Sequence, residues 1–352
     1  MNNVLIIGGG IHGIFTSIYL KKKFPRASVD IIEKKKNLMN GSSFATHNRA
    51  NKGYHYPRST KTANECKKGW EYFNKKYSDC FENISNSYYI IEKTSKTSFN
   101  SFYKFLKENK YDFKVKNPPN MSLNKKFITG SFEVFEGCFD HVKLTKKTIK
   151  LIKKYKINTF QNFEFDKLIK NKNNFVIISK LKKKITRKYD LIINCTYSDI
   201  NHVLKKFGIR ERKNLYKTQY TFIPVVKTKK KIPGLTVIDG PYLTIMPYSS
   251  KKNHYLLYDV INSISKKPIS KQNKLYRYKR MLKRFNKYFP DDHNFKLVDF
   301  LDGTRPIPKK NTGDRRSTII QKNMKFGVPI YSIREGKYIS APYIAKEFVN
   351  KL

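Results

Sequence analysis

A glycine-rich turn near the start of the chain places the strongest constraint on its fold. Residues 8–13 read GGGIHG, a GxGxxG pattern that follows a short β-branched run and opens a segment with apolar positions at helical spacing. The first glycine of the pattern permits a tight turn, the second lets the backbone approach a diphosphate, and the third lets the helix pack closely on the strand. Phosphate is attracted to the N–H groups at such a helix start. The residues expected at a dinucleotide are Gly8, Gly10, Ile11, His12 and Gly13.

A carboxylate ends the second strand of the same unit. The run 29–33 is β-branched and closes on Glu33, about 20 residues after the last glycine of the turn. A carboxylate at this place accepts hydrogen bonds from ribose hydroxyls and repels a 2′-phosphate, which disfavours NADP. FAD and NAD both use this kind of turn, so the βαβ unit by itself leaves both open.

The chain also carries a large positive charge. Among 352 residues there are 74 Lys and Arg but 26 Asp and Glu, which gives a formal net charge of +48. Counterion release makes such a charge favourable for nucleic-acid binding. Only 13 of the basic residues are Arg, the better reader of bases, and the lysines are spread along the whole chain. We therefore expect no specific nucleic-acid partner, and keep attraction to an acidic partner or a membrane surface as an alternative.

Cysteine spacing and hydropathy bear on the location of the protein. Cys66, Cys80, Cys138 and Cys195 lie far apart with no CxxC pair, so we expect neither a metal site nor a disulfide framework. No run approaches 18 apolar residues, which argues against a membrane span. Glycines interrupt the apolar run of residues 1–20 and no cleavage site follows, so a secretory signal is not expected. The expected location is cytoplasmic.

The expected elements alternate in a way that suggests two lobes. An irregular polar loop over 41–58 follows the βαβ unit, then a mainly helical region over 62–110 with a strand inside it, and a helix over 143–156. A buried strand returns at 189–194, about 160 residues after Glu33. The later expected elements are strands at 220–226, 235–239, 242–246, 255–260 and 325–332, and helices at 270–289 and 341–352.

This alternation predicts an α/β chain, α+β overall, with a Rossmann-like dinucleotide lobe and a mainly antiparallel substrate lobe. The dinucleotide lobe is expected to comprise residues 1–65, 136–212 and 300–352. The substrate lobe is expected to comprise residues 66–135 and 213–299, so the two lobes are interleaved along the chain.

Four segments carry a resemblance to a known family. They are residues 4–33, the loop 41–58, the strand YDLIINCT over 189–196, and the pair formed by GTRP at 303–306 and GKYISAP at 336–342. Together they resemble the FAD-dependent oxidoreductases of the D-amino-acid oxidase superfamily, which includes glycerol-3-phosphate dehydrogenase, glycine and sarcosine oxidases and 2-hydroxyglutarate oxidase. The resemblance spans nearly the whole chain and implies FAD as the cofactor. The loop lacks the histidine and the cysteine through which covalent members attach flavin, so non-covalent binding is expected.

The resemblance also implies roles at the cofactor. In such proteins the loop 41–58 runs under the flavin, and the segment before the last helix faces it with backbone N–H groups that stabilise an anionic reduced ring. An N-cap or plain loop role is the alternative for the two loop serines. The further cofactor-binding residues that it implies are Ser42, Ser43, Asn48, Arg49, Thr196, Gly336, Lys337, Tyr338, Ile339 and Ser340.

On the substrate side, Arg305 is expected to hold a substrate carboxylate through two parallel hydrogen bonds, unless it is a plain surface arginine. His55 stands where the family has its active-site loop and is expected to accept a proton, unless it is only hydrogen-bonded within the loop. Residues 51–53 read NKG where related hydroxy-acid oxidases have I-H-x-G, so that family base is missing here. The catalytic candidates are His55, Tyr54 and Arg305, and the substrate-binding candidates are Tyr56, Tyr242, Tyr258 and Arg305, with core packing as the alternative for Tyr242 and Tyr258.

The expected function is that of an FAD-dependent oxidoreductase. It would oxidise a C–H bond next to a hydroxyl or amine on a small polar, anionic substrate, with hydride transfer to flavin N5 and reoxidation by O₂ or an electron carrier. FAD is preferred over NAD because no further βα unit follows Glu33 directly. The alternatives are an NAD-linked dehydrogenase, or a non-catalytic nucleotide- or nucleic-acid-binding protein with a dinucleotide fold. The substrate, the electron acceptor and the oligomeric state stay open.

Overall fold

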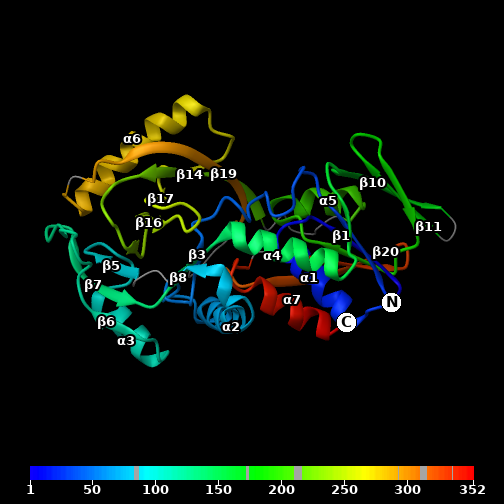
Figure 1. The fold of residues 1–352 in the computed structure, drawn as a ribbon, viewed down its shortest axis with the longest axis horizontal. Helices are drawn as coiled ribbons and strands as arrows, with labels where there is room; N and C mark the ends of the chain where they lie inside the picture. Colours follow the sequence, from blue (N-terminus) through cyan, green and yellow to red (C-terminus); the bar gives the residue numbers. More distant parts are fainter. Residues whose placement is uncertain (83–86, 172–173, 210–215, 292, 310–314, 335) are drawn as a thin grey trace.

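A computed structural model describes residues 1–82, 87–171, 174–209, 216–291, 293–309, 315–334 and 336–352. These residues form two lobes that lie side by side, each built on its own large sheet (Figure 1). No helix in the described ranges is long and apolar enough to span a membrane. All four cysteines are free and buried.

The first lobe contains a six-stranded sheet in the order β20-β21-β13-β1-β2-β9. Five of its strands are parallel, and only the edge strand β20 runs antiparallel to its neighbour. The bounds are β1 (Asn3–Ile7), β2 (Ser28–Ile32), β9 (Asn158–Phe160), β13 (Leu191–Asn194), β20 (Ile319–Lys325) and β21 (Val328–Arg334). The expected strand at 325–332 is therefore a β20–β21 hairpin, a correction that reflects the tight turn at Phe326 and Gly327, both at positive φ.

Both faces of this sheet are covered, as continuous apolar strands require. Val4 and Ile6 of β1 face a helical layer, whereas Leu5 and Ile7 face a small antiparallel sheet. The helical layer comprises α1 (Ile11–Lys23), α2 (Thr60–Tyr77), α4 (His141–Lys154) and α7 (Ala341–Asn350). The opposite layer comprises β10 (Phe165–Asn171), β11 (Asn174–Ser179), β12 (Lys184–Arg187), the 3₁₀ turn η2 (Tyr197–Asp199) and α5 (Ile200–Lys206).

The second lobe is built on a nine-stranded sheet in the order β18-β14-β17-β16-β15-β5-β7-β6, with β19 also paired to β14. All its pairs are antiparallel except β15 with β5. Its elements are β5 (Ser87–Glu92), α3 (Phe99–Glu108), β6 (Phe113–Val115), β7 (Ile128–Val134), β14 (Tyr216–Lys227), β15 (Gly234–Ile238), β16 (Leu243–Pro247), β17 (His254–Asp259), β18 (Ile264–Ser265), α6 (Lys271–Tyr288) and β19 (Lys296–Pro308). The parallel-rich and antiparallel sheets confirm the predicted fold class.

Two features connect the lobes. A small sheet of β3 (Arg49–Ala50), β8 (Gly137–Phe139) and β4 (Phe81–Glu82) lies between them (Figure 1). In the chain, η1 (Ser78–Cys80) directly precedes β4, and α4 follows β8. Strand β19 pairs with β14 over its whole length, yet Thr304 Oγ1 reaches Ser198 of η2 at 2.8 Å. Strand β19 therefore runs across residue 300, where the sequence predicts a lobe boundary, and the predicted interleaved domain limits stay a prediction.

The mainly helical region predicted at 62–110 is two helices, α2 and α3, that flank the predicted strand β5. The long strand β19 was not predicted from the sequence, because Gly303, Pro306 and Pro308 interrupt the residue pattern that is typical of a strand. The paired strand β14 supplies the hydrogen bonds that hold β19 extended despite these residues.

Candidate active site

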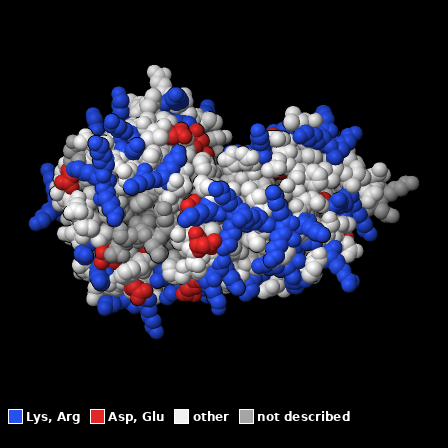
Figure 2. Space-filling view, viewed as in Figure 1, with Lys and Arg blue, Asp and Glu red and all other residues white. Residues whose placement is uncertain are grey.

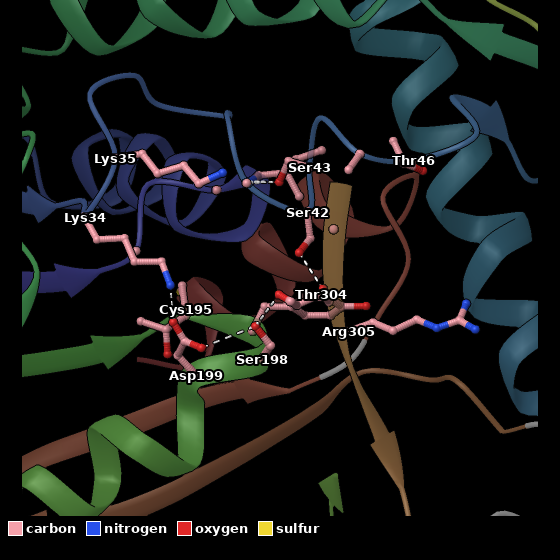
Figure 3. Close-up of a pocket in the computed structure, with 18 of the residues that line it drawn as sticks. Lys34, Lys35, Ser42, Ser43, Thr46, Cys195, Ser198, Asp199, Thr304 and Arg305 are labelled. Carbon is pink, nitrogen blue, oxygen red and sulfur yellow. Dashed lines mark hydrogen bonds and ion pairs between the residues drawn. The ribbon is translucent and has the colours of Figure 1, made fainter. Parts of the chain in front are cut away.

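A cavity of about 690 Å³ opens where the two lobes meet (Figure 3). The segments that line it include the turn between β1 and α1, the end of β2, the loop 41–47, the stretch from Cys195 to Val203, β19, and the turn before α7. Its size lies within the range of about 300–1,000 Å³ that is typical of ligand sites. Segments at the start, middle and end of the chain thus meet around one space.

The glycine turn forms one wall of this cavity, and its glycines are sterically required. Gly8 has φ +104°, and a Cβ there would lie 2.8 Å from the carbonyl oxygen of Cys195. A Cβ on Gly13 would lie 2.0 Å from the carbonyl oxygen of Gly8. Gly10 and Ile11 also line the cavity at the start of α1. This arrangement brings the N-terminus of α1 to the cavity, beside the hydroxyl of Ser43.

Glu33 stands at the end of β2 and braces the same turn. One carboxylate oxygen accepts a hydrogen bond from the Gly9 N–H at 2.7 Å, and the other accepts from the Lys35 N–H at 2.9 Å. Next to it, Lys34 forms an ion pair with Asp199 of η2, so that Lys34 crosses between two walls of the cavity (Figure 3). The carboxylate of Glu33 therefore lines the cavity with its position fixed by backbone groups.

Two serines of the loop 41–47 tie it to neighbouring elements. Ser43 Oγ accepts a hydrogen bond from the Ile11 N–H at 3.1 Å, and Ser42 Oγ donates to the Thr304 carbonyl at 2.5 Å (Figure 3). Both serines line the cavity, as does Thr196, whose hydroxyl donates to Asn194 Oδ1 at 2.6 Å. Ser43 therefore accepts a hydrogen bond from the first turn of α1 although it lies outside that helix. This is a capping role, the alternative that the sequence left open for this serine.

The turn before α7 closes another side of the cavity. Gly336 has φ +81°, and a Cβ there would meet Thr318 Oγ1 at 2.4 Å and His12 Nε2 at 3.1 Å. Gly336, Lys337 and Tyr338 line the cavity together with His12. Burial lowers the pKa of His12 to about 4, so its imidazole is neutral at physiological pH. Its buried Nδ1 has no hydrogen-bond partner among the described residues.

Ile339 and Ser340 lie below this turn and do not line the cavity. Ile339 belongs to the core that includes α1 and α7. The Ser340 hydroxyl donates to Glu65 Oε1 at 3.0 Å, and Glu65 also binds the N–H and hydroxyl of Thr318. These contacts attach the turn to α2. Ser340 therefore stabilises the position of the cavity wall without lining the cavity itself.

Arg305 lies at the end of the cavity away from the Lys34–Asp199 pair (Figure 3). Its Nε donates to Gln219 Oε1 at 2.7 Å, and its Cζ lies 5.7 Å from the centroid of the Tyr258 ring. The ring of His47 meets the same tyrosine edge-on, with centroids 4.6 Å apart. Arg305, Tyr258 and His47 all line the cavity.

A buried polar cluster stands beside this end, centred on Arg49. The Arg49 guanidinium donates to the Tyr89 hydroxyl at 3.1 Å, bonds to Thr236, and lies 3.9 Å from Glu136 Oε2. Burial raises the pKa of Glu136, and Arg49 opposes that shift. Arg49 and Asn48 are outside the cavity lining, and Asn48 is held by a hydrogen bond from the Phe139 N–H to its carbonyl.

His55 and Tyr56 belong to the same cluster and reach the cavity through Lys337. The Lys337 Nζ lies over the Tyr56 ring, 4.6 Å from its centroid. His55 Nδ1 lies 3.4 Å from Arg49 Nη1. Burial, Arg49 and Lys337 lower the pKa of His55 to about 3, so its ring is neutral.

Tyr54 and Tyr242 are two further sequence candidates that lie away from the cavity. Tyr54 is fully buried, and its hydroxyl donates to the carbonyl of Asp112 at 2.8 Å. Tyr242 packs in the core of the second lobe, and its hydroxyl donates to Glu92 Oε2 at 2.9 Å. In the structure both tyrosines pack inside the protein, and their hydroxyls donate hydrogen bonds there. For Tyr242 this is the core packing that the sequence left open as an alternative.

Among the lining residues that were not predicted from the sequence are His47, Lys34 and Ser198. His47 lies in the loop 41–58 directly before Asn48, so its proximity to that loop's candidates was the available signal. Lys34 follows Glu33 within a lysine run, where nothing in the sequence separates it from a solvated lysine. Ser198 joins the site only because η2 contacts β19.

The residues present fit an FAD molecule. The glycine turn packs so closely that a Cβ on Gly8 or Gly13 would clash with backbone atoms, and it lies beside a buried, unpartnered nitrogen of His12. Glu33 closes the end of β2, where a ribose is expected, and the cavity continues from there to Arg305. A cavity that extends past the dinucleotide turn to a second, cationic end suits a long cofactor whose reactive ring lies far from its adenosine.

Comparisons with known proteins agree with this geometry. The family model described as DAO, FAD dependent oxidoreductase, matches residues 3–328. No curated protein sequence gives a significant match.

Solved structures with the same fold are similar over nearly the full chain. Glycine oxidase from Geobacillus kaustophilus superposes with a TM-score of 0.75 at 13% identity, covering 100% of this chain and 95% of that one. L-α-glycerophosphate oxidase from Mycoplasma pneumoniae gives 0.74 at 16% identity, covering 100% and 94%. L-proline dehydrogenase from P. horikoshii gives 0.75 at 14% identity, covering 99% and 92%. At these identities the likeness shows the fold, and the family match over 3–328 shows that the chain belongs to the DAO family of FAD-dependent oxidoreductases.

Proposed function

We propose that this protein binds FAD non-covalently in the cavity and oxidises a C–H bond next to a hydroxyl or amine of a small anionic substrate. The observation that carries the proposal is the continuity of one cavity from the glycine turn to the cationic end at Arg305 and Lys337. The substrates named for similar structures, glycine, L-proline and glycerophosphate, are all small and carry an anionic group, which supports the same class here.

Specific residues would hold the cofactor. The start of α1 and the loop serines Ser42 and Ser43 would bind the diphosphate region, and Glu33 would bind a ribose. The N–H groups of the turn at Gly336 and Lys337 would face the flavin ring. Bound FAD supplies the two-electron acceptor for the reaction.

Non-covalent attachment agrees with the state of the cysteine at the site. Cys195 lines the cavity, and burial raises the pKa of its thiol well above the usual value. A protonated thiol is a poor nucleophile, so we do not propose it as a tether. Four free, buried cysteines also support the expected reducing, cytoplasmic location.

Arg305 would bind the anionic group of the substrate. Its Nε is used by Gln219, so the other N–H groups of the guanidinium are the ones that would bind this anionic group. Two parallel N–H groups there match the two oxygens of a carboxylate or phosphate. A neutral imidazole near this end, that of His47 or His55, would accept the proton that leaves the substrate, because neither ring carries a charge at neutral pH.

The electron acceptor would be O₂ or an acidic electron carrier. Lysine and arginine side chains cover the face of the molecule shown in Figure 2, with few carboxylates between them. Such a surface attracts an acidic carrier and increases its rate of association at low salt. Turnover with an acidic carrier that slows as ionic strength rises would support this partner, whereas turnover with O₂ at a salt-independent rate would identify an oxidase.

Purified protein tests the proposal directly. It should be yellow, release FAD on denaturation, and show bleaching of the flavin absorption under anaerobic conditions with one member of a panel of amino acids, hydroxy acids and glycerol 3-phosphate. Protein that stays colourless after incubation with FAD but is stabilised by NAD would contradict it.

A further inference from the structure

The cationic end of the cavity contains a buried polar atom that no described residue satisfies. His47 Nε2 has no hydrogen-bond partner there, and the Tyr258 hydroxyl beside it interacts with the Arg305 side chain. Their rings meet edge-on at a centroid distance of 4.6 Å, so the two atoms belong to one small region. Buried polar groups in native proteins are almost always paired, and an unpaired one calls for an explanation such as a bound ligand.

Arg305 completes this region and sets the sign of its charge. The guanidinium lies over the face of the Tyr258 ring, and all three residues line the same cavity. A ligand placed against Arg305 would therefore carry a negative group. The same ligand would need a hydrogen-bond donor for the neutral nitrogen of His47.

The groups that face His47 hold its imidazole neutral. They come from four parts of the chain: Arg49 and His55 in the loop and β3, Arg305 on β19, Tyr258 on β17, and Lys337 before α7. Burial first, and then Arg49, Arg305, His55 and Lys337, lower the pKa of His47 well below its usual value. A neutral imidazole with a free ring nitrogen accepts protons and hydrogen bonds.

We propose that the substrate is a hydroxy compound with an adjacent anionic group, held by Arg305, and that His47 accepts the proton of its hydroxyl. This inference rests on the proposed function and narrows it from two substrate classes to one. In the proposed step, the O–H bond breaks and its proton forms a bond to His47 Nε2. The C–H bond breaks as hydride, which FAD accepts with its electron pair, and the carbon–oxygen bond becomes a carbonyl.

Electrostatics favours the hydroxyl class over the amine class. An amino acid enters as a zwitterion whose ammonium group would face Arg305, Lys337 and Arg49, three positive charges at this end. A hydroxy acid or a polyol phosphate carries only negative charge and meets no such repulsion. An alcohol is also a much weaker acid than an ammonium group, so it depends on a positioned proton acceptor.

His47 suits this role better than His55. His47 lines the cavity, whereas His55 does not. The Nδ1 of His55 already faces the guanidinium of Arg49 at 3.4 Å, while the Nε2 of His47 faces no described partner. His55, the proton acceptor predicted from the sequence, lies eight positions further along the same loop.

The first test measures anaerobic flavin reduction with lactate, glycerol 3-phosphate, alanine and L-proline. We expect reduction by a hydroxy compound and none by the two amino acids; lactate against glycerol 3-phosphate distinguishes a carboxylate from a phosphate anion. His47→Gln should lower the reduction rate about 100-fold or more, with FAD absorption retained. The matched control is His254→Gln, a histidine at the other end of β17 that is outside the cavity and should react as the wild type.

A second test needs no turnover. Pyruvate, a carboxylate without a hydroxyl to oxidise, should bind the FAD-loaded protein and perturb its flavin spectrum. A bound anion offsets the charge of Arg305 and raises the pKa of His47, so pyruvate should bind more tightly as pH falls from 8 to 5. His47→Gln and His47→Asn should both remove this pH dependence, and the wild-type titration alone tests it if both variants fail to fold.

Several results would overturn the inference. Reduction of bound FAD by alanine or proline, with both hydroxy compounds inert, would leave the proposed function standing and reject this substrate class. Unchanged reduction by hydroxy compounds in a folded His47→Gln variant, or pH-independent pyruvate binding in the wild type, would reject His47 as the proton acceptor. Protein that never retains FAD would reject the proposed function and this inference together.

Discussion

Individual glycines at the site differ in how closely other atoms pack around them. Gly8 and Gly13 are required because a Cβ on either would lie within 3 Å of a backbone carbonyl oxygen. Gly41, in the loop of the same cavity, has open space around an added Cβ. Glycines of equal appearance in the sequence therefore differ in what they tolerate.

Gly13→Ala should destabilise the protein and prevent FAD retention. The added methyl would lie 2.0 Å from the Gly8 carbonyl oxygen, so the helix start must move, at a cost of about 1–3 kcal/mol. Chemical unfolding and the flavin absorption of the purified variant measure the two effects. Gly41→Ala is the control for stability and should change the free energy of unfolding by less than about 1 kcal/mol; equal effects of the two substitutions would contradict the steric argument.

Arg305→Ala should weaken substrate binding about 100-fold while FAD is retained, because a charged hydrogen bond is worth about 1.5–3 kcal/mol. Arg305→Lys should restore only part of the loss, since an ammonium lacks the two parallel N–H groups. Michaelis constants for the substrate that bleaches the flavin measure this. Arg280→Ala, an exposed arginine on α6, should leave them unchanged, and so would Arg305→Ala if Arg305 were only a surface residue.

Buried histidines should make the folded protein sensitive to acid. His141 is buried against Tyr338, and burial lowers its pKa to about 4. The unfolded state takes up a proton below about pH 6.5 and the folded state only near pH 4, so stability is present at neutral pH and is lost as pH falls through this range. Between pH 7.5 and 5 the loss from His141 is about 2 kcal/mol.

Urea unfolding at several pH values checks this expectation. His141→Gln should be less stable than the wild type at pH 7.5 but should lose less stability on acidification. A variant with the same pH slope as the wild type would show that His141 is protonated equally in both states.

Among the elements, helix α2 is the one that supports the site from outside. Glu65 binds Ser340 and Thr318, and the backbone of Ser340 packs against Gly69 one turn further on. These contacts fix the turn before α7, whose residues line the cavity. An element without a single cavity residue therefore determines the position of one wall.

Glu65→Ala should loosen that wall. The loss leaves the hydroxyls of Ser340 and Thr318 with fewer partners and costs about 1–3 kcal/mol of stability, and FAD should dissociate more readily. Thermal melts with and without added FAD measure both effects. Glu71→Ala, on the exposed face of the same helix, should stay within about 0.5 kcal/mol of the wild type; an equal loss there would point to helix charge as the cause.

Over the whole molecule, the net charge of +48 acts on stability as well as on partners. The lysines gather over α4 and spread across the visible face of both lobes (Figure 2). Like charges at these densities repel one another, and salt screens that repulsion within about 10 Å at 0.1 M. The fold therefore tolerates a surface whose charge opposes compaction.

The melting temperature should accordingly rise when NaCl increases from about 0.02 to 0.5 M, because screening removes repulsion in the folded state. Differential scanning fluorimetry at fixed pH and fixed FAD concentration measures it. A melting temperature that falls with salt would show that attractive ion pairs such as Lys34–Asp199 outweigh the repulsion.

The dinucleotide unit could be predicted because its signals are local. The turn 8–13, the strands on either side and Glu33 lie within about 30 consecutive residues, and each follows from steric and hydrogen-bonding rules that act over a few positions. The alternation of short strands after residue 216 likewise predicted an antiparallel sheet. The fold class and the cofactor class were therefore determined by the sequence itself.

The catalytic end of the cavity was decided by the tertiary structure. His47, Tyr258, Arg305 and Lys337 come from four segments up to 290 residues apart, and each is an ordinary residue in its own segment. Tyr54 and Tyr258 look alike in the sequence, yet one donates its hydroxyl inside the core and the other faces the cavity. Which polar atoms remain unpaired, and therefore available to a ligand, depends on the packing of both lobes, and no local rule contains that information.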